Sequence, residues 1–125
     1  MAVALVLDPN YGTKLNDLVR RMPVWVADTP INRSVTEELW KQYREAGSAT
    51  ELSIFKINTD VSLEDTCLSI LNTIDLHHGE YSSEPPYDML EVIGIAASPS
   101  IRKALSSIGF ATVIDSPAGF QASRS

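Results

Sequence analysis

The sequence has little cysteine, few basic residues and no long apolar run, and each shortage excludes a class of protein. A single thiol, Cys67, cannot form a disulfide within the chain or supply a cysteine-based zinc cluster. The longest apolar stretches, at residues 3–7 and 92–97, are far shorter than the roughly 20 residues that a membrane-spanning helix needs. Because no Lys or Arg precedes the first apolar run, we expect no signal peptide, no membrane partner and a cytoplasmic location.

Acidic residues outnumber basic ones. The 125-residue chain has 10 Lys and Arg against 16 Asp and Glu, which gives a formal net charge of −6. Nucleic-acid binding depends on clustered Lys and Arg that neutralise phosphates, so we expect no nucleic-acid partner. The length suits one domain that buries a core of its own.

Apolar runs and helical stripes alternate along the chain. Short apolar runs predict five strands, at residues 3–7, 24–27, 52–57, 90–97 and 111–114. Helical periodicity predicts four helices, which begin at Thr13, Ser34, Ser62 and Ser98. This alternation predicts a three-layer α/β/α sandwich around a mostly parallel five-stranded sheet. We favour the flavodoxin-like strand order 2-1-3-4-5, with the Rossmann-like order 3-2-1-4-5 as the alternative.

Two serines carry the strongest helix-start signals. Ser34 opens the sequence Ser-Val-Thr-Glu, a capping box in which Glu37 reaches back to the first residue. Ser98 is followed by Pro99, which suits the first position of a helix. We expect replacement of either serine by alanine to cost about 1 kcal/mol.

Residues 1–115 are predicted to form a single α/β domain. Residues 116–125 are small and polar, include Pro117 and Gly119, and are predicted to form a C-terminal tail. Without a fifth helix, half of one sheet face has no cover, and a two-fold partner is the simplest cover. We therefore predict a homodimer whose interface includes Leu18, Phe110, Val113 and Phe120.

Acidic residues follow several of the predicted strands. The carboxyl ends of parallel strands form the edge at which open α/β sheets bind ligands. Mg²⁺ suits two or three carboxylates at such an edge, whereas the alternative role of Asp in these turns is to cap the next helix. Backbone N–H groups of the first turn could bind an anion. The predicted ligand-binding residues are Asp8, Gly12, Thr13, Asp28, Arg33 and Ser98, and the predicted metal ligands are Asp8, Asp28 and Asp60.

No motif in the sequence selects one chemistry. The turn after the first strand lacks both the G-x-G-x-x-G pattern and the Walker A lysine. The acidic residues after strands one and three are placed similarly to those of response-regulator receiver domains. Here, however, Asp8 has no acidic neighbour and no Lys follows the last strand. We therefore predict a non-catalytic binding or interaction domain. The alternative is a Mg²⁺-dependent enzyme or a protein that binds a nucleotide or another phosphorylated ligand.

Overall fold

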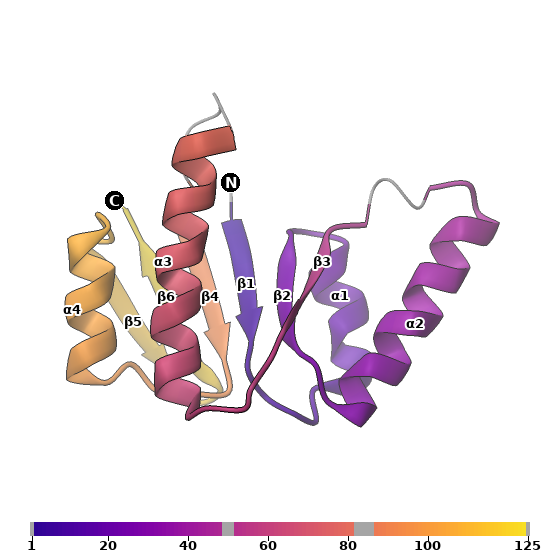
Figure 1. Ribbon diagram of the computed structural model, residues 1–125, viewed down its shortest axis with the longest axis horizontal. Helices are drawn as coiled ribbons and strands as arrows, with labels where there is room; N and C mark the ends of the chain where they lie inside the picture. The colour runs from indigo at the N-terminus through magenta and orange to yellow at the C-terminus, as the bar shows by residue number, and fades with distance from the viewer. Residues whose placement is uncertain (1, 49–51, 82–86, 125) are drawn as a thin grey trace.

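The computed structural model describes residues 2–48, 52–81 and 87–124, with the side chains of 74–81 excepted. It has a mixed α/β fold with one strand more than expected (Figure 1). Its elements are β1 (Ala2–Val6), the 3-10 helix η1 (Gly12–Lys14), α1 (Leu15–Val19), β2 (Val24–Ala27), α2 (Pro30–Glu45), β3 (Ile54–Ile57), α3 (Leu63–Tyr81), β4 (Met89–Ile93), α4 (Pro99–Ser107), β5 (Thr112–Ser116) and β6 (Gly119–Ser123). None of the described helices is long and apolar enough to cross a membrane.

The strand order is β3-β2-β1-β4-β6-β5. β1, β2, β3 and β4 are parallel, and β6 is antiparallel to both of its neighbours. The sheet therefore does not have the flavodoxin-like order that we predicted. Its first four strands follow the Rossmann-like alternative, because α1 and α2 place β2 and β3 successively outward before α3 returns the chain to β4, beside β1.

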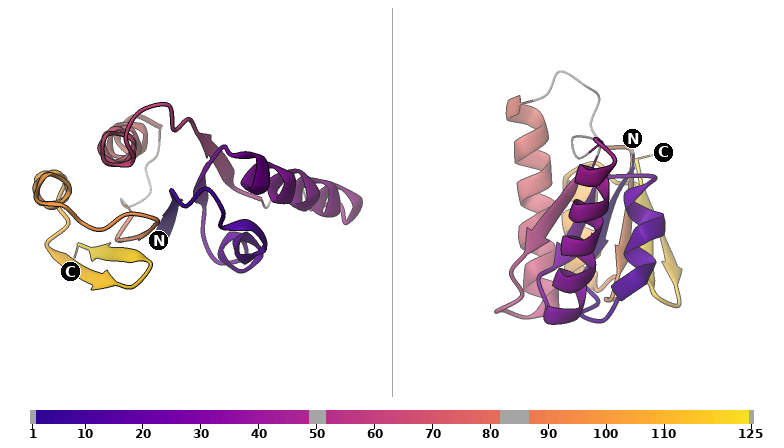
Figure 2. Two further views of the ribbon diagram at one scale, coloured as in Figure 1. Left: turned by 90° about the horizontal axis from the view of Figure 1, so that it is seen from below. Right: turned by 90° about the vertical axis from the view of Figure 1, so that its right-hand side faces the viewer.

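Helices cover only half of each sheet face. α1 and α2 pack over β1, β2 and β3, whereas α3 and α4 pack on the opposite face, over β1, β4 and β6 (Figure 2). On the α3 side, β2 and β3 carry a stacked aromatic pair, Trp25 and Phe55, with ring centres 4.9 Å apart. On the α1 side, no described helix covers β4, β6 and β5, as expected from the missing fifth helix.

The core on the α3 side contains Cys67, which is fully buried. Burial, and secondarily the charge of Glu64, raises the pKa of the thiol to about 12. Because the thiolate is the reactive form, this cysteine packs as a small apolar side chain at neutral pH.

The described residues of the predicted polar tail, 116–124, do not form a tail. They supply β6, which lies between β4 and β5, and Phe120 is only 1% exposed. Pro117 lies in the hairpin turn between β5 and β6, and Gly119 begins β6. The hydroxyl of Ser116 accepts the N–H of Gly119 at 3.2 Å. After β6, the Arg124 guanidinium lies 4.3 Å from the centre of the Phe110 ring. The small and polar residues of this segment therefore form a turn and an inner strand.

The residues predicted to form a homodimer interface pack instead against other residues of the same chain. Leu18, Phe110 and Phe120 are buried in the isolated protein, and Val113 is half-buried against the same core as Phe120. Leu18, Phe110 and Phe120 are therefore core residues rather than interface residues. Homodimerisation itself stays a prediction.

The two serine signals have different outcomes. Ser98 is the N-cap of α4, because its hydroxyl accepts the N–H of Ile101 at 3.2 Å, and it also donates to Glu64 at 2.5 Å. Ser34 does not begin α2, since that helix begins four residues earlier at Pro30. Proline suits the first helical position because it has no N–H to leave unpaired. Ser34 is thus an exposed residue inside the helix.

We expect Ser98→Ala to lower the free energy of unfolding by about 1 to 2 kcal/mol, because it removes the cap and the partner of Glu64. Ser34→Ala is the matched control and should cost nothing, since alanine is the better helix former. Urea-induced unfolding followed by circular dichroism measures both. An equal loss in the two variants would contradict the observed start of α2.

We expect Phe120→Ala to lower the free energy of unfolding by about 3 to 5 kcal/mol, because it opens a cavity in the core. Phe55, which is 46% exposed, supplies the control. Phe55→Ala should cost clearly less, although it removes the stack on Trp25. If Phe120→Ala were no more harmful than Phe55→Ala, β6 would not be part of the folded sheet.

Candidate functional site

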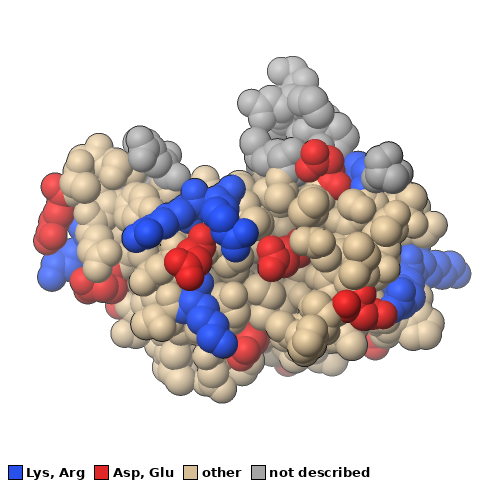
Figure 3. All heavy atoms as spheres, turned by 180° about the vertical axis from the view of Figure 1, so that it is seen from behind, with Lys and Arg blue, Asp and Glu red and all other residues tan. Residues whose placement is uncertain are grey.

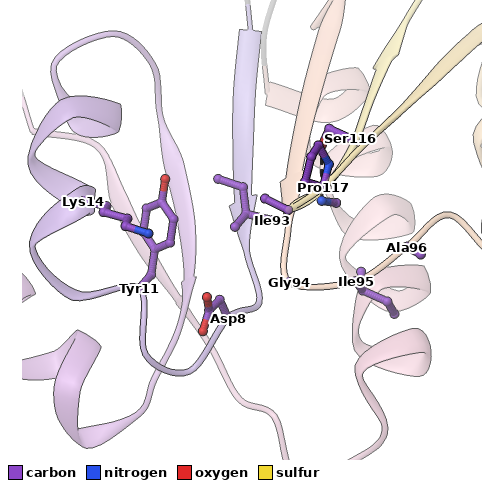
Figure 4. Close-up of a pocket in the computed structure, with 11 residues that line it drawn as sticks. Asp8, Tyr11, Lys14, Ile93, Gly94, Ile95, Ala96, Ser116 and Pro117 are labelled. Carbon is purple, nitrogen blue, oxygen red and sulfur yellow. Dashed lines mark hydrogen bonds between the residues drawn. The ribbon is translucent and has the colours of Figure 1, made fainter.

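A cavity of about 400 Å³ lies at the carboxyl ends of β1 and β4 (Figure 4). Three segments line it: the turn after β1, the end of β4 with the loop that follows, and the hairpin turn between β5 and β6. β1 and β4 are neighbours, yet the chain leaves them towards opposite faces, to α1 and to α4. Such a switch point is the place where open parallel sheets bind ligands.

The buried side chain of Asn32 shapes the turn after β1. Asn32 lies in the first turns of α2 and is 0% exposed. Its amide nitrogen donates to the carbonyl oxygens of Asp8 at 2.8 Å and Ala27 at 3.3 Å. Its amide oxygen accepts the N–H of Gly12 at 3.0 Å. These bonds hold the turn against α2, so the side chains that it carries stay above the sheet edge.

Two glycines allow the backbones around the cavity to approach closely. Gly94 has φ +109°, and a Cβ atom there would collide with the backbone nitrogen of Asp8. A Cβ atom on Gly119 would collide with the carbonyl oxygen of Val92. Both positions therefore require glycine, since any side chain would push the end of β4 away from β1 or from β6.

Opposite charges from the turn after β1 and from η1 reach the same cavity. The carboxylate of Asp8 accepts the N–H of Asn10 at 2.9 Å, and the ammonium of Lys14 lies 5.8 Å from the centre of the Tyr11 ring. Among the described residues, neither Asp8 nor Lys14 forms an ion pair. The cavity therefore holds one negative and one positive group that are free to bind a ligand.

Tyr11 stands between Lys14 and Ile93 in the view of Figure 4. Burial raises the pKa of its phenol, and the charges of Glu91, Asp17 and Asp8 act in the same direction, against the charge of Arg21. The phenol therefore remains protonated at neutral pH and can donate a hydrogen bond.

Of the six predicted ligand-binding residues, only Asp8 lines the cavity. Thr13 is exposed outside its lining, and Ser98 caps α4. Asp28 and Arg33 form an ion pair with 3.0 Å between the guanidinium Nε and a carboxylate oxygen. The hydrogen bond from Arg33 lowers the pKa of Asp28. Asp28 and Arg33 thus bind each other, and neither side chain lines the cavity.

The structure does not bring the predicted metal ligands together. Asp8 lines the cavity, Asp28 is paired with Arg33, and Asp60 is exposed in the loop after β3. Within the described part of the chain, no three His, Cys, Asp or Glu side chains are placed to hold a metal ion. Asp8, Asp28 and Asp60 therefore lie in three different environments and do not form one cluster.

Sequence reasoning missed Tyr11, Lys14 and the hairpin turn. One available signal was Gly94, because a glycine inside a predicted strand often marks a close backbone approach. No comparable signal pointed to the hairpin, which comes from the segment predicted as a tail. The chain matches no protein-family model, no curated protein and no solved structure.

We expect Asn32→Ala to lower the free energy of unfolding by roughly 2 to 4 kcal/mol, because two carbonyls and one N–H lose a buried partner. Asn10→Ala, at an exposed position of the same turn, is the control and should change stability by less than about 0.5 kcal/mol. Chemical denaturation measures both variants. Equal stability of the two would show that the Asn32 amide does not hold the turn.

Proposed function

We propose that the protein binds a small zwitterionic molecule, one that carries both an amino and an acidic group, in the cavity between β1, β4 and the hairpin turn. The observation that carries this proposal is the pair of free opposite charges, Asp8 and Lys14, at one cavity. A carboxylate accepts hydrogen bonds from an ammonium, and the lysine ammonium donates to a carboxylate. A volume of about 400 Å³ suits a small ligand.

The cavity favours a zwitterion over a nucleotide or another phosphorylated ligand. Binding of phosphate at the first turn would use its backbone N–H groups, but the N–H of Gly12 already donates to Asn32. Lys14 is the one cation among the described lining residues, and Asp8 would repel a phosphate placed beside it. A ligand of no net charge avoids this repulsion and uses both side chains.

We infer binding without catalysis. The hydroxyl of Ser116 accepts the N–H of Gly119, as in a turn, and among the described lining residues it has no general base as a partner. The site supplies recognition groups on a rigid frame of strand ends. This arrangement supports a binding protein in preference to an enzyme.

Free amino acids should raise the melting temperature of the wild-type protein. A ligand at a hundred times its Kd adds about 2.7 kcal/mol of stability. N-acetylated amino acids and amino-acid esters should bind at least tenfold more weakly, because each lacks one of the two charges. Thermal melts and isothermal titration calorimetry measure these differences.

The matched variants are Asp8→Asn and Lys14→Gln, each of which should weaken amino-acid binding at least tenfold. Asp17→Asn is the control, because Asp17 is an exposed residue of α1 outside the cavity lining. No thermal shift with any amino acid, or equal binding by wild type and the two cavity variants, would refute the proposed function.

A further inference from the structure

The cavity continues onto the uncovered part of the sheet. A second hollow of about 260 Å³ lies beside it and shares four lining residues, Tyr11, Ile93, Ser116 and Ala118. The two hollows together form one groove, which begins at the carboxyl ends of the strands and runs over the α1 side of β4, β6 and β5. On this face Lys and Arg side chains gather towards α1, and acidic side chains lie directly beside them (Figure 3).

The floor of the second hollow follows from strand register. Glu91 on β4 lies opposite Gln121 on β6, and Gln121 lies opposite Ile114 on β5. These three side chains therefore form one row on the same face of the sheet. The next row towards the carboxyl ends has Gly119 at its centre, between Ile93 and Ser116. Ile93 and Ser116 of this row line both hollows, so the two hollows adjoin each other there.

The second hollow offers a carboxylate, an amide and an aromatic ring. Glu91 is partly exposed and lines the same hollow as Tyr11. Its negative charge is the second cause, after burial, of the raised pKa of the Tyr11 phenol. The Tyr11 ring already holds one cation near it, the Lys14 ammonium. A carboxylate next to an aromatic ring suits a planar cation, which donates two parallel hydrogen bonds and stacks on the ring.

We propose that the second hollow binds the planar cation of a guanidinium group, so that the ligand is an amino acid of the arginine type. This inference rests on the proposed function, because Asp8 and Lys14 would hold the ammonium and carboxylate of the same molecule. Each charge of the protein then faces an opposite charge of the ligand. Asp8 faces the ammonium, Lys14 faces the carboxylate and Glu91 faces the guanidinium. Glu91 precedes Gly94 by three residues, a span of about 10 Å along a strand, which an extended arginine covers.

The test compares arginine with citrulline, in which a neutral urea group replaces the guanidinium without a large change of shape. Isothermal titration calorimetry on the wild-type protein should show arginine binding at least tenfold tighter than citrulline. Glu91→Gln should abolish this preference and leave the affinity for citrulline unchanged. Glu37→Gln, at an exposed position on α2, is the control and should keep the preference.

A second variant keeps the inference testable even if Glu91→Gln does not fold. Gln121→Glu places another carboxylate in the same row and should increase the preference for arginine over citrulline at least threefold. Equal affinities for arginine and citrulline in the wild type would overturn the inference and leave the proposed function standing. A preference that survives Glu91→Gln would also overturn it. If no amino acid binds, the proposed function itself fails.

Discussion

The carboxyl edge of the sheet depends on one buried amide. Asn32 joins both ends of the turn after β1, at Asp8 and Gly12, to the end of β2, a segment that is separate in the chain. Only an amide side chain donates twice and accepts at the same time, so neither a carboxylate nor a hydroxyl could replace it. The hydroxyl of Thr29 donates a further hydrogen bond to the same turn, to the carbonyl oxygen of Pro9 at 2.6 Å. The positions of Asp8, Tyr11 and Lys14 all follow from this attachment.

The groove exists because no described helix covers one half of the sheet on the α1 side. The chain places two helices on each face, but over opposite halves, and on the α1 side the half formed by β4, β6 and β5 stays open. The exposed row on that half is mostly polar, with Glu91 and Gln121 beside Ile114, which is 58% exposed. A polar sheet face does not require a partner subunit to be stable in water. The open half-face is thus accessible in a single copy of the chain.

Local patterns predicted the elements, whereas contacts between distant segments decided the rest. The cap at Ser98 was found from its neighbouring residues, whereas the local capping pattern at Ser34 lies inside α2. The strand order could not be predicted, because it depends on where α3 returns the chain. β6 did carry a signal, since the buried Phe120 and Ala122 alternate with Gln121 and Ser123, but the preceding Pro117 and Gly119 resembled a loose tail. Of the site, only Asp8 was predicted, because Tyr11 and Lys14 form a cavity only when the hairpin turn lies opposite them.

The position of β6 has a consequence for how the protein folds as it is synthesised. β4 leaves the ribosome well before residues 119–123, so one of its edges has no partner until β6 arrives. β5 is made earlier than β6, but its described strand pairing is with β6 alone, so it cannot join the sheet before β6 is made. An open edge beside a buried strand such as β4 is a template for pairing with another chain. The arrival of β6 therefore decides whether a nascent chain closes this part of its own sheet or associates with a neighbour.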